Sequence, residues 1–282
     1  MGMEDYVFSE QPFYVSGDGY IKLYQAVSAS RRTRPIVIRR QKLTADLFQT
    51  DLPRKVDDFI AASLSQVRNA GLDPCRLLEV YLDVHRAPDQ YYVFHVVEMR
   101  DGNTSVHLYM RYLFEAGLSQ PLLDTPSIAH ELVQSQQGNP AVKIAGYDID
   151  SELFAEAMAK LYKGTTADHQ KLPIVVKCHE FSRPKYRDTL SAELSKAINA
   201  GIVQARIQHP RSCRILDLHV NVTGAPIMYY VHHVLEALES DLYKEIVKKK
   251  AQSVLYSEAD LWDFLTQLSS VMAFSHDMVI YM

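Results

Sequence analysis

The chain has 282 residues, of which 47% are hydrophobic and 23% charged, a composition typical of a globular protein with one large or two small domains. Its formal net charge of −4 gives no field that would favour nucleic acid, and no apolar run approaches the roughly 18 to 20 residues of a membrane-spanning helix. The three cysteines are widely spaced and odd in number, which argues against a disulfide framework and suits a reducing compartment. The acidic segment Met1–Glu10 has no apolar core, so we expect no signal peptide.

The first half of the chain is predicted to contain four strands and a long helix. Alternating and β-branched runs predict the strands at Gly19–Val27, Pro35–Leu43, Arg76–Val84 and Tyr91–Glu98. Apolar residues at helical spacing predict the helix over Leu52–Ala70, between the second and third strands. Another helix is expected around Ser127–Gln136.

The second half is predicted to repeat this order. Strands are expected at Met158–Thr165, Pro173–Phe181, Cys213–Val222 and Met228–Glu236, with a long helix over Thr189–Ile207. Two more helices are predicted at Leu242–Lys250 and Glu258–Met272, the second with Ser257 as its cap.

The two halves are related in sequence. A shift of 138 residues aligns Lys22–Glu98 with Lys160–Glu236 without a gap, and 24 of these 77 pairs, about 31%, are identical. Average residue usage gives roughly 6% for unrelated sequences. We therefore predict an α+β fold of two tandem antiparallel-sheet-plus-helix units. Their boundary is placed in the Gln-, Gly- and Pro-rich link, so that copy 1 is residues 1–137 and copy 2 residues 138–282.

Copy 2 resembles the small lobe of a protein kinase. The run Pro173–Lys177 is similar to the family's Val-Ala-Ile-Lys strand, and Gln208-His209-Pro210 to its His-Pro turn. Tyr230–Glu239 resembles the strand and hinge that hold adenine, and Glu258–His276 the helix that leads to the catalytic loop. If ATP is bound, the resemblance implies contacts from a set of five residues: Lys177, Glu193, Leu235, Glu236 and Leu238.

Several groups that phosphoryl transfer needs are not found in the sequence. Gly17-Asp18-Gly19 precedes the first strand of copy 1, but a lone Gly-x-Gly is better interpreted as a turn, and Arg39 occupies the Lys position. In copy 2 the position of the helix Glu holds Ala200; Glu193 could replace it if the helix were shifted by two turns, and is otherwise a solvated carboxylate. No catalytic Asp or Mg²⁺-binding Asp follows Phe274–Met282, so we expect no catalytic residues.

Other clusters carry less chemistry. His232 and His233 are neighbours on a strand and face opposite sides, so we expect no metal site there. Two basic stretches could face an acidic partner or phosphate, although a solvated face or hairpin loop is the interpretation we favour: Arg31, Arg32, Arg34, Arg39, Arg40 and Lys42, and Lys248, Lys249 and Lys250.

The function expected from the sequence is that of a non-catalytic, kinase-like interaction or structural protein. Two small lobes without large lobes would leave apolar faces to be buried against each other, another subunit or a larger assembly, so we expect a protein partner, no resident cofactor and an intracellular location, cytoplasmic or cytoskeleton-associated. Three alternatives stay open: an ATP-binding regulatory module, part of a longer active kinase, and an unrelated α+β binding module.

Overall fold

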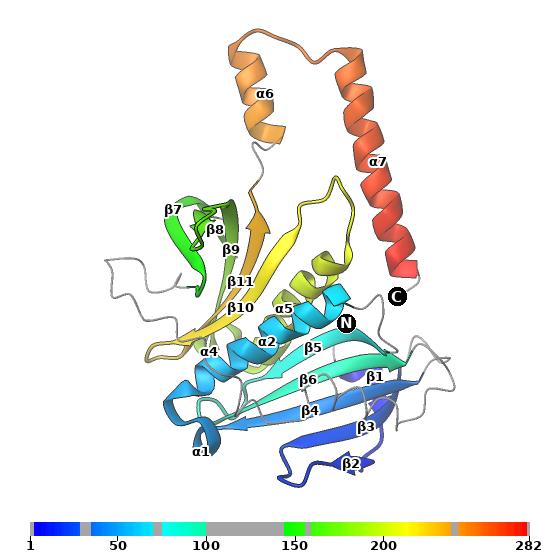
Figure 1. The fold of residues 1–282 in the computed structure, drawn as a ribbon, viewed down its shortest axis with the longest axis vertical. Helices are drawn as coiled ribbons and strands as arrows, with labels where there is room; N and C mark the ends of the chain where they lie inside the picture. The colour runs from blue at the N-terminus through cyan, green and yellow to red at the C-terminus, as the bar shows by residue number, and fades with distance from the viewer. Residues whose placement is uncertain are drawn as a thin grey trace.

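The protein has a mixed α+β fold with two antiparallel sheets, seen in a computed structural model (Figure 1). The structure describes residues 3–28, 35–69, 75–99, 144–155, 159–237 and 242–280. The helix expected around Ser127–Gln136 and the boundary between residues 137 and 138 lie outside the described residues.

The first sheet has six strands in the order β1-β3-β4-β6-β5, with β2 paired to β3. A single 3₁₀ turn, Met3–Asp5, precedes β1. The helices α1 (Ala45–Phe48) and α2 (Leu52–Asn69), with a 3₁₀ turn between them, lie between β4 and β5 in the chain. The strands are β1 (Tyr6–Phe8), β2 (Tyr14–Val15), β3 (Ile21–Ser28), β4 (Ile36–Thr44), β5 (Cys75–Asp83) and β6 (Gln90–Met99).

The second sheet has five strands in the order β10-β11-β9-β8-β7. Its helices are α4 (Arg183–Tyr186) and α5 (Leu190–Arg206), joined by a 3₁₀ turn over Arg187–Thr189. The strands are β7 (Tyr147–Ala155), β8 (Lys160–Thr166), β9 (Pro173–Ser182), β10 (Ile215–Thr223) and β11 (Met228–Glu236).

The elements follow the 138-residue repeat closely. Helices α2 and α5 begin at Leu52 and Leu190, which are 138 positions apart, and each follows one helical turn and one 3₁₀ turn. Gln49 and Arg187, another equivalent pair, both adopt a positive φ, of 46° and 39°. The prediction of two tandem sheet-plus-helix units is therefore confirmed. Strands β1, β2 and β7 were not predicted, and α7 continues to Ile280, beyond the expected end at Met272.

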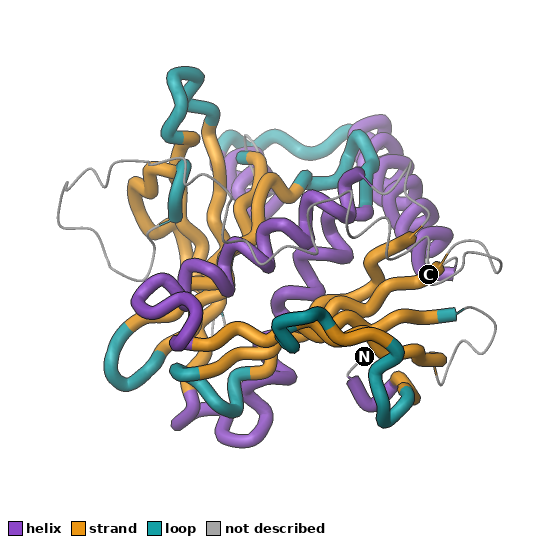
Figure 2. Tube along the Cα trace, turned by 60° about the horizontal axis from the view of Figure 1, so that its bottom comes forward, coloured by secondary structure: helices purple, strands orange, loops and turns teal. Residues whose placement is uncertain are grey.

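The helices α2 and α5 are amphipathic, and each lies between the sheet of its own half and an edge strand of the other half. Their buried residues recur at three- and four-residue spacing. Helix α2 packs on β10, α5 packs on β5, and the two helices touch. Figure 2 shows this helix pair between the strands of the two sheets.

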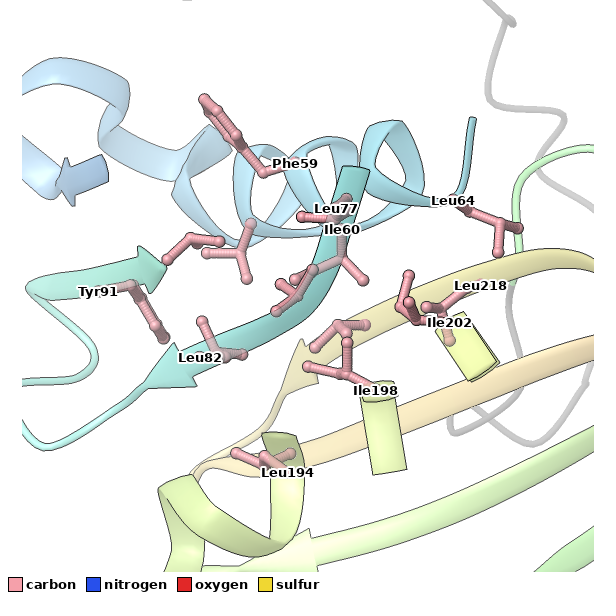
Figure 3. Packing of buried hydrophobic residues seen from close by; sticks show 14 of the residues in the cluster. Phe59, Ile60, Leu64, Leu77, Leu82, Tyr91, Leu194, Ile198, Ile202 and Leu218 are labelled. Carbon is pink, nitrogen blue, oxygen red and sulfur yellow. The ribbon is translucent and has the colours of Figure 1, made fainter. Parts of the chain in front are cut away.

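One hydrophobic cluster therefore contains residues from both halves. In Figure 3, Ile60 of α2 and Ile198 of α5 point toward each other, near Leu82 of β5 and Leu218 of β10. Ile60, Ile198, Leu82 and Leu218 are all 0% exposed. The sequence left open whether the apolar faces are buried against each other, against another subunit or in a larger assembly. In this structure the two halves bury such faces against each other.

Two helices project from this core (Figure 1): α6 (Leu242–Ala251) and α7 (Glu258–Ile280). An ion pair of 3.6 Å between Lys249 Nζ and Asp260 Oδ2 joins them. Across the described part of the chain, no helix combines the length and the apolar character that a membrane span requires.

Candidate functional site

Lys177 lies in the middle of β9, between Leu161 of β8 and His233 of β11. Its side chain shares a sheet face with those of His179 and Phe181, because alternate residues of a strand point the same way. Phe181 belongs to the shared core, so this face is the one that α5 covers. Lys177 is half-buried and therefore only partly accessible to a ligand.

His233 is the polar neighbour of Lys177 on this face. Its Nε2 lies 2.9 Å from the carbonyl oxygen of Ala197 on α5, and its ring centroid lies 5.3 Å from that of His179. Burial, helped by the nearby His179 and Lys177, lowers the pKa of His233 to about 4. The imidazole is thus neutral near pH 7 and donates its Nε2 hydrogen to the helix.

Copy 1 repeats this arrangement with Arg39 at the position of Lys177. Arg39 is only 2% exposed, which contradicts a solvated location for this member of the basic stretch. Burial, followed by the charge of Arg39, lowers the pKa of His95, the equivalent of His233, to about 3. The Ser63 hydroxyl donates to the Phe59 carbonyl at 2.8 Å and lies 2.9 Å from His95 Nε2, so it relays the contact between strand and helix.

Gly201 explains why copy 2 needs no such relay. It occupies the position equivalent to Ser63, and a Cβ atom there would lie 3.3 Å from His233 Nε2. Without that atom, His233 reaches Ala197 directly, at the position equivalent to Phe59. Both histidines therefore fasten a sheet to its own helix, which is a structural role.

The other residues that the kinase resemblance implies are not brought together around Lys177. Glu193 is in the first turn of α5 and forms no ion pair with Lys177. Leu235 and Glu236 are at the end of β11, where Glu236 accepts a hydrogen bond from the Arg214 backbone at 2.8 Å. Leu238 lies outside the described residues. Within the described ranges there is no group of three or more His, Cys, Asp and Glu side chains that could hold a metal ion.

A second cluster, which sequence reasoning missed, joins the halves at α2 and β10. His219 Nδ1 lies 3.0 Å from Asp57 Oδ2, and His219 Nε2 lies 3.1 Å from Asp217 Oδ2. Burial opposes the charge on His219, but the close carboxylates of Asp217 and Asp57 outweigh burial and raise the pKa of His219 to about 10. Asp57 Oδ1 also accepts the Val220 N–H at 2.7 Å. A charged histidine held between two carboxylates cross-links the halves.

The same interface occurs a second time with different chemistry. Ser195 of α5 accepts the Leu82 N–H at 3.0 Å, and Ser195 and Leu82 are equivalent to Asp57 and Val220. Two arginines are reciprocal as well. Arg68 Nη2 donates to the Ile215 carbonyl at 2.8 Å, and Arg206 Nη2 donates to the equivalent Leu77 carbonyl at 2.6 Å. These contacts give the two halves a local two-fold relationship.

An open surface pocket of about 430 Å³, called the cavity below, lies where the end of β5 meets α4 and the start of α5. Arg183 Nη2 donates to the carbonyl oxygens of Val84 and His85 at 2.9 and 2.8 Å, which closes one wall of the cavity. Ser191 Oγ accepts the Val84 N–H at 3.1 Å. The cavity is lined by eight residues: Val84, His85, Arg183, Pro184, Arg187, Asp188, Leu190 and Ser191.

Asp83, His85 and Ser191 do not form a nucleophilic triad. Asp83 Oδ1 and Ser191 Oγ lie 2.6 and 3.4 Å from the same ring nitrogen, His85 Nδ1. A triad requires the acid and the nucleophile on opposite nitrogens of the imidazole. The cluster offers hydrogen bonds and charge to a ligand, but its geometry is not that of a triad.

No protein-family model matches the chain, and a search of curated proteins gave no match.

Proposed function

We propose that this chain is a non-catalytic, kinase-like interaction or structural subunit of a larger intracellular assembly, and that α7 is its contact surface. The observation that carries the proposal is the exposure of α7. Six large hydrophobic side chains on this helix are 42 to 62% exposed: Leu261, Trp262, Phe264, Leu265, Leu268 and Met272. Exposed apolar surface of this kind commonly marks an interaction site.

The arrangement of α7 supports a helix-in-groove or helix-pair contact. Leu261, Leu265, Leu268 and Met272 recur at four- and three-residue spacing and therefore share one face of the helix. Helix α7 has no Lys or Arg, and its carboxylates include Glu258, Asp260 and Asp263 near the N-terminus. We expect a partner with an apolar groove and basic residues at its rim.

The surroundings of Arg39 and Lys177 support the proposal that the chain is non-catalytic. Arg39 is 2% exposed, so its guanidinium cannot contact a nucleotide without repacking of the sheet. Lys177 has a histidine beside it instead of the carboxylate that would position it for a phosphate. The ATP-binding alternative predicts stabilisation by ATP and Mg²⁺ that Lys177→Met abolishes; thermal unfolding with millimolar ATP measures it.

Trp262 is the sole tryptophan of the chain, so tryptophan fluorescence reports on α7 alone. In the isolated chain its emission should be that of a solvent-exposed indole, and it should shift to shorter wavelength when α7 is covered in an assembly. Leu265→Asp places a charge on the apolar face and should remove the assembly, seen by sedimentation and by affinity purification from the native source. The variant should fold, because Leu265 is 47% exposed.

Thr266→Asp is the matched control, because it adds the same charge one residue later, about 100° around the helix. It should retain the assembly. If the Leu265→Asp chain co-purifies with the same proteins in the same amounts as wild type and Trp262 keeps an exposed emission in that complex, α7 is not the contact surface and the proposal fails.

A further inference from the structure

The repeat supplies an internal comparison for the cavity between β5 and α5. Each cavity-lining residue has an equivalent 138 positions away, in the region where the end of β10 meets α1 and the start of α2. There the positions of Arg183, Arg187 and Ser191 hold Ala45, Gln49 and Pro53. The position of His85 holds Thr223. The positions equivalent to the lining residues therefore hold no Arg or Lys, although Arg54 and Lys55 follow in the first turn of α2.

Backbone geometry does not explain the difference. Arg187 has a positive φ, but its equivalent Gln49 has one too, so this conformation belongs to the repeated architecture. Both halves build the same turn before their long helix, and they differ in the side chains that the turn carries. The conformation of the turn therefore does not depend on the basic side chains.

The two arginines have hydrogen-bonding capacity left over. A guanidinium has five N–H donors, and the two contacts of Arg183 to backbone carbonyls come from Nη2 alone. No described residue pairs with Nε or Nη1 of Arg183, or with the guanidinium of Arg187, which is exposed. Arg183 is held in place by the loop it binds, so part of the site is organised before any ligand arrives.

The N-terminus of α5 also favours a negatively charged ligand in the cavity. Leu190 and Ser191 are its first residues and line the cavity, and Thr189 makes no side-chain cap. The unpaired N–H groups of a helix N-terminus attract anions. Three carboxylates oppose this attraction and limit the affinity: Asp188 in the lining, Glu193 in the first turn, and Asp83, whose Oδ1 lies 2.6 Å from His85 Nδ1.

We propose that this cavity, between His85 of copy 1 and Arg187 of copy 2, binds an oxyanion, a phosphate or carboxylate group, carried by a small ligand or by a peptide side chain. Arg183 and Arg187 supply charge-assisted hydrogen bonds, and His85 and Ser191 lie at the wall. The volume of about 430 Å³ leaves room for more than the anionic group alone. The site is remote in sequence from α7 and independent of the function proposed above.

The test is a titration of the full chain with inorganic phosphate, O-phosphoserine and glutamate, by calorimetry and by amide NMR shifts. Phosphate should shift the amides of His85 and Ser191. Arg187→Gln should weaken phosphate binding by about tenfold, since it removes one charge-assisted contact. Asp188→Asn should strengthen it, since it removes a repelling carboxylate.

Two controls separate a site from general surface charge. Lys185→Gln removes a positive charge only two residues from Arg187, but the Lys185 side chain does not line the cavity. Gln49→Ala alters the position in copy 1 that is equivalent to Arg187. Both should bind phosphate like wild type. Stronger binding of O-phosphoserine than of glutamate assigns a phosphate ester, and the reverse assigns a carboxylate. If phosphate does not bind at millimolar concentration, or if Lys185→Gln weakens it as much as Arg187→Gln, the proposal is overturned.

Discussion

At the scale of single residues, the molecule shows how one position can be filled by different chemistry when its surroundings are duplicated. Asp57 and Ser195 both accept a backbone N–H from the opposite half. Asp57 also holds His219, whose charge is balanced by Asp217. The ionic version buries charge and becomes costly if one member is removed.

Asp57→Ala should therefore lower the free energy of unfolding by about 2 to 4 kcal/mol, because it leaves a buried N–H and a charged histidine without their partner. Ser195→Ala, the equivalent change, should cost about 1 to 2 kcal/mol, because it removes only neutral hydrogen bonds. Urea unfolding at pH 7 measures both. Asp58→Ala is the control on the same helix: its side chain is 40% exposed, and a change below about 1 kcal/mol is expected. Equal losses from Asp57→Ala and Ser195→Ala would contradict the ionic cross-link.

The pKa of His233, about 4, predicts a pH dependence of stability. The unfolded chain binds a proton on this imidazole below about pH 6.5, whereas the folded chain resists it until about pH 4. Stability should thus fall as the pH drops from 6.5 to 4. His233→Gln should remove up to about 3 kcal/mol of that fall, seen as a flatter plot of unfolding free energy against pH. Identical slopes for both proteins would show that His233 is not held neutral.

At the scale of secondary structure, strands and helices with a strong pattern were predictable. The central strands and both long helices lie within a few residues of the expected ranges. Runs rich in Val, Ile and Tyr are a clear signal for strands, and apolar residues at helical spacing are a clear signal for helices. Strand β7 was missed because acidic residues such as Asp148, Asp150 and Glu152 alternate along it, and most of it is exposed at a sheet edge. Such residues are depleted in strands, and only pairing with β8 overrides that preference.

The pairing of β7 with β8 depends on a close backbone approach. A Cβ atom on Gly164 would clash with the Asp148 carbonyl oxygen, at a separation that real Cβ atoms essentially never show. Gly164→Ala should push β7 away from β8, lower the unfolding free energy by about 1 to 3 kcal/mol, and speed amide exchange along β7. The equivalent Ala26 of β3 provides the control, since Ala26→Gly should leave the protections of β3 largely in place. Unchanged exchange of β7 in Gly164→Ala would contradict the close approach.

At the scale of the whole molecule, the packing of each long helix against a strand of the other half was not predictable from sequence. The apolar face of α2 indicates that other elements must cover the helix, but not which strands they are. The same is true of the interfacial cluster, where Asp57 and His219 are 162 positions apart and neither carries a local motif. Lys177 and Glu193, which the family resemblance implies as ATP contacts, lie in β9 and in the first turn of α5, and their role in ATP binding stays a prediction.

Shared burial predicts that the two halves unfold together. Ile60 and Ile198 are identical, equivalent and 0% exposed, so Ile60→Ala and Ile198→Ala should each cost about 2 to 5 kcal/mol. Each should shift one common transition in calorimetry, because either cavity opens in the same core. Two separate transitions, of which each variant moves only one, would show that the halves are independent.

The reciprocal contacts of Arg68 and Arg206 have a consequence for how this molecule could vary. Residue i of one half meets residue j of the other, and j meets i, which is the geometry of an isologous homodimer. In a homodimer every substitution occurs twice, on both sides of the axis. Covalent linkage of the two units lifts that constraint, so a gain at one position, such as the arginines beside α5, carries no obligatory change at its mirror position beside α2.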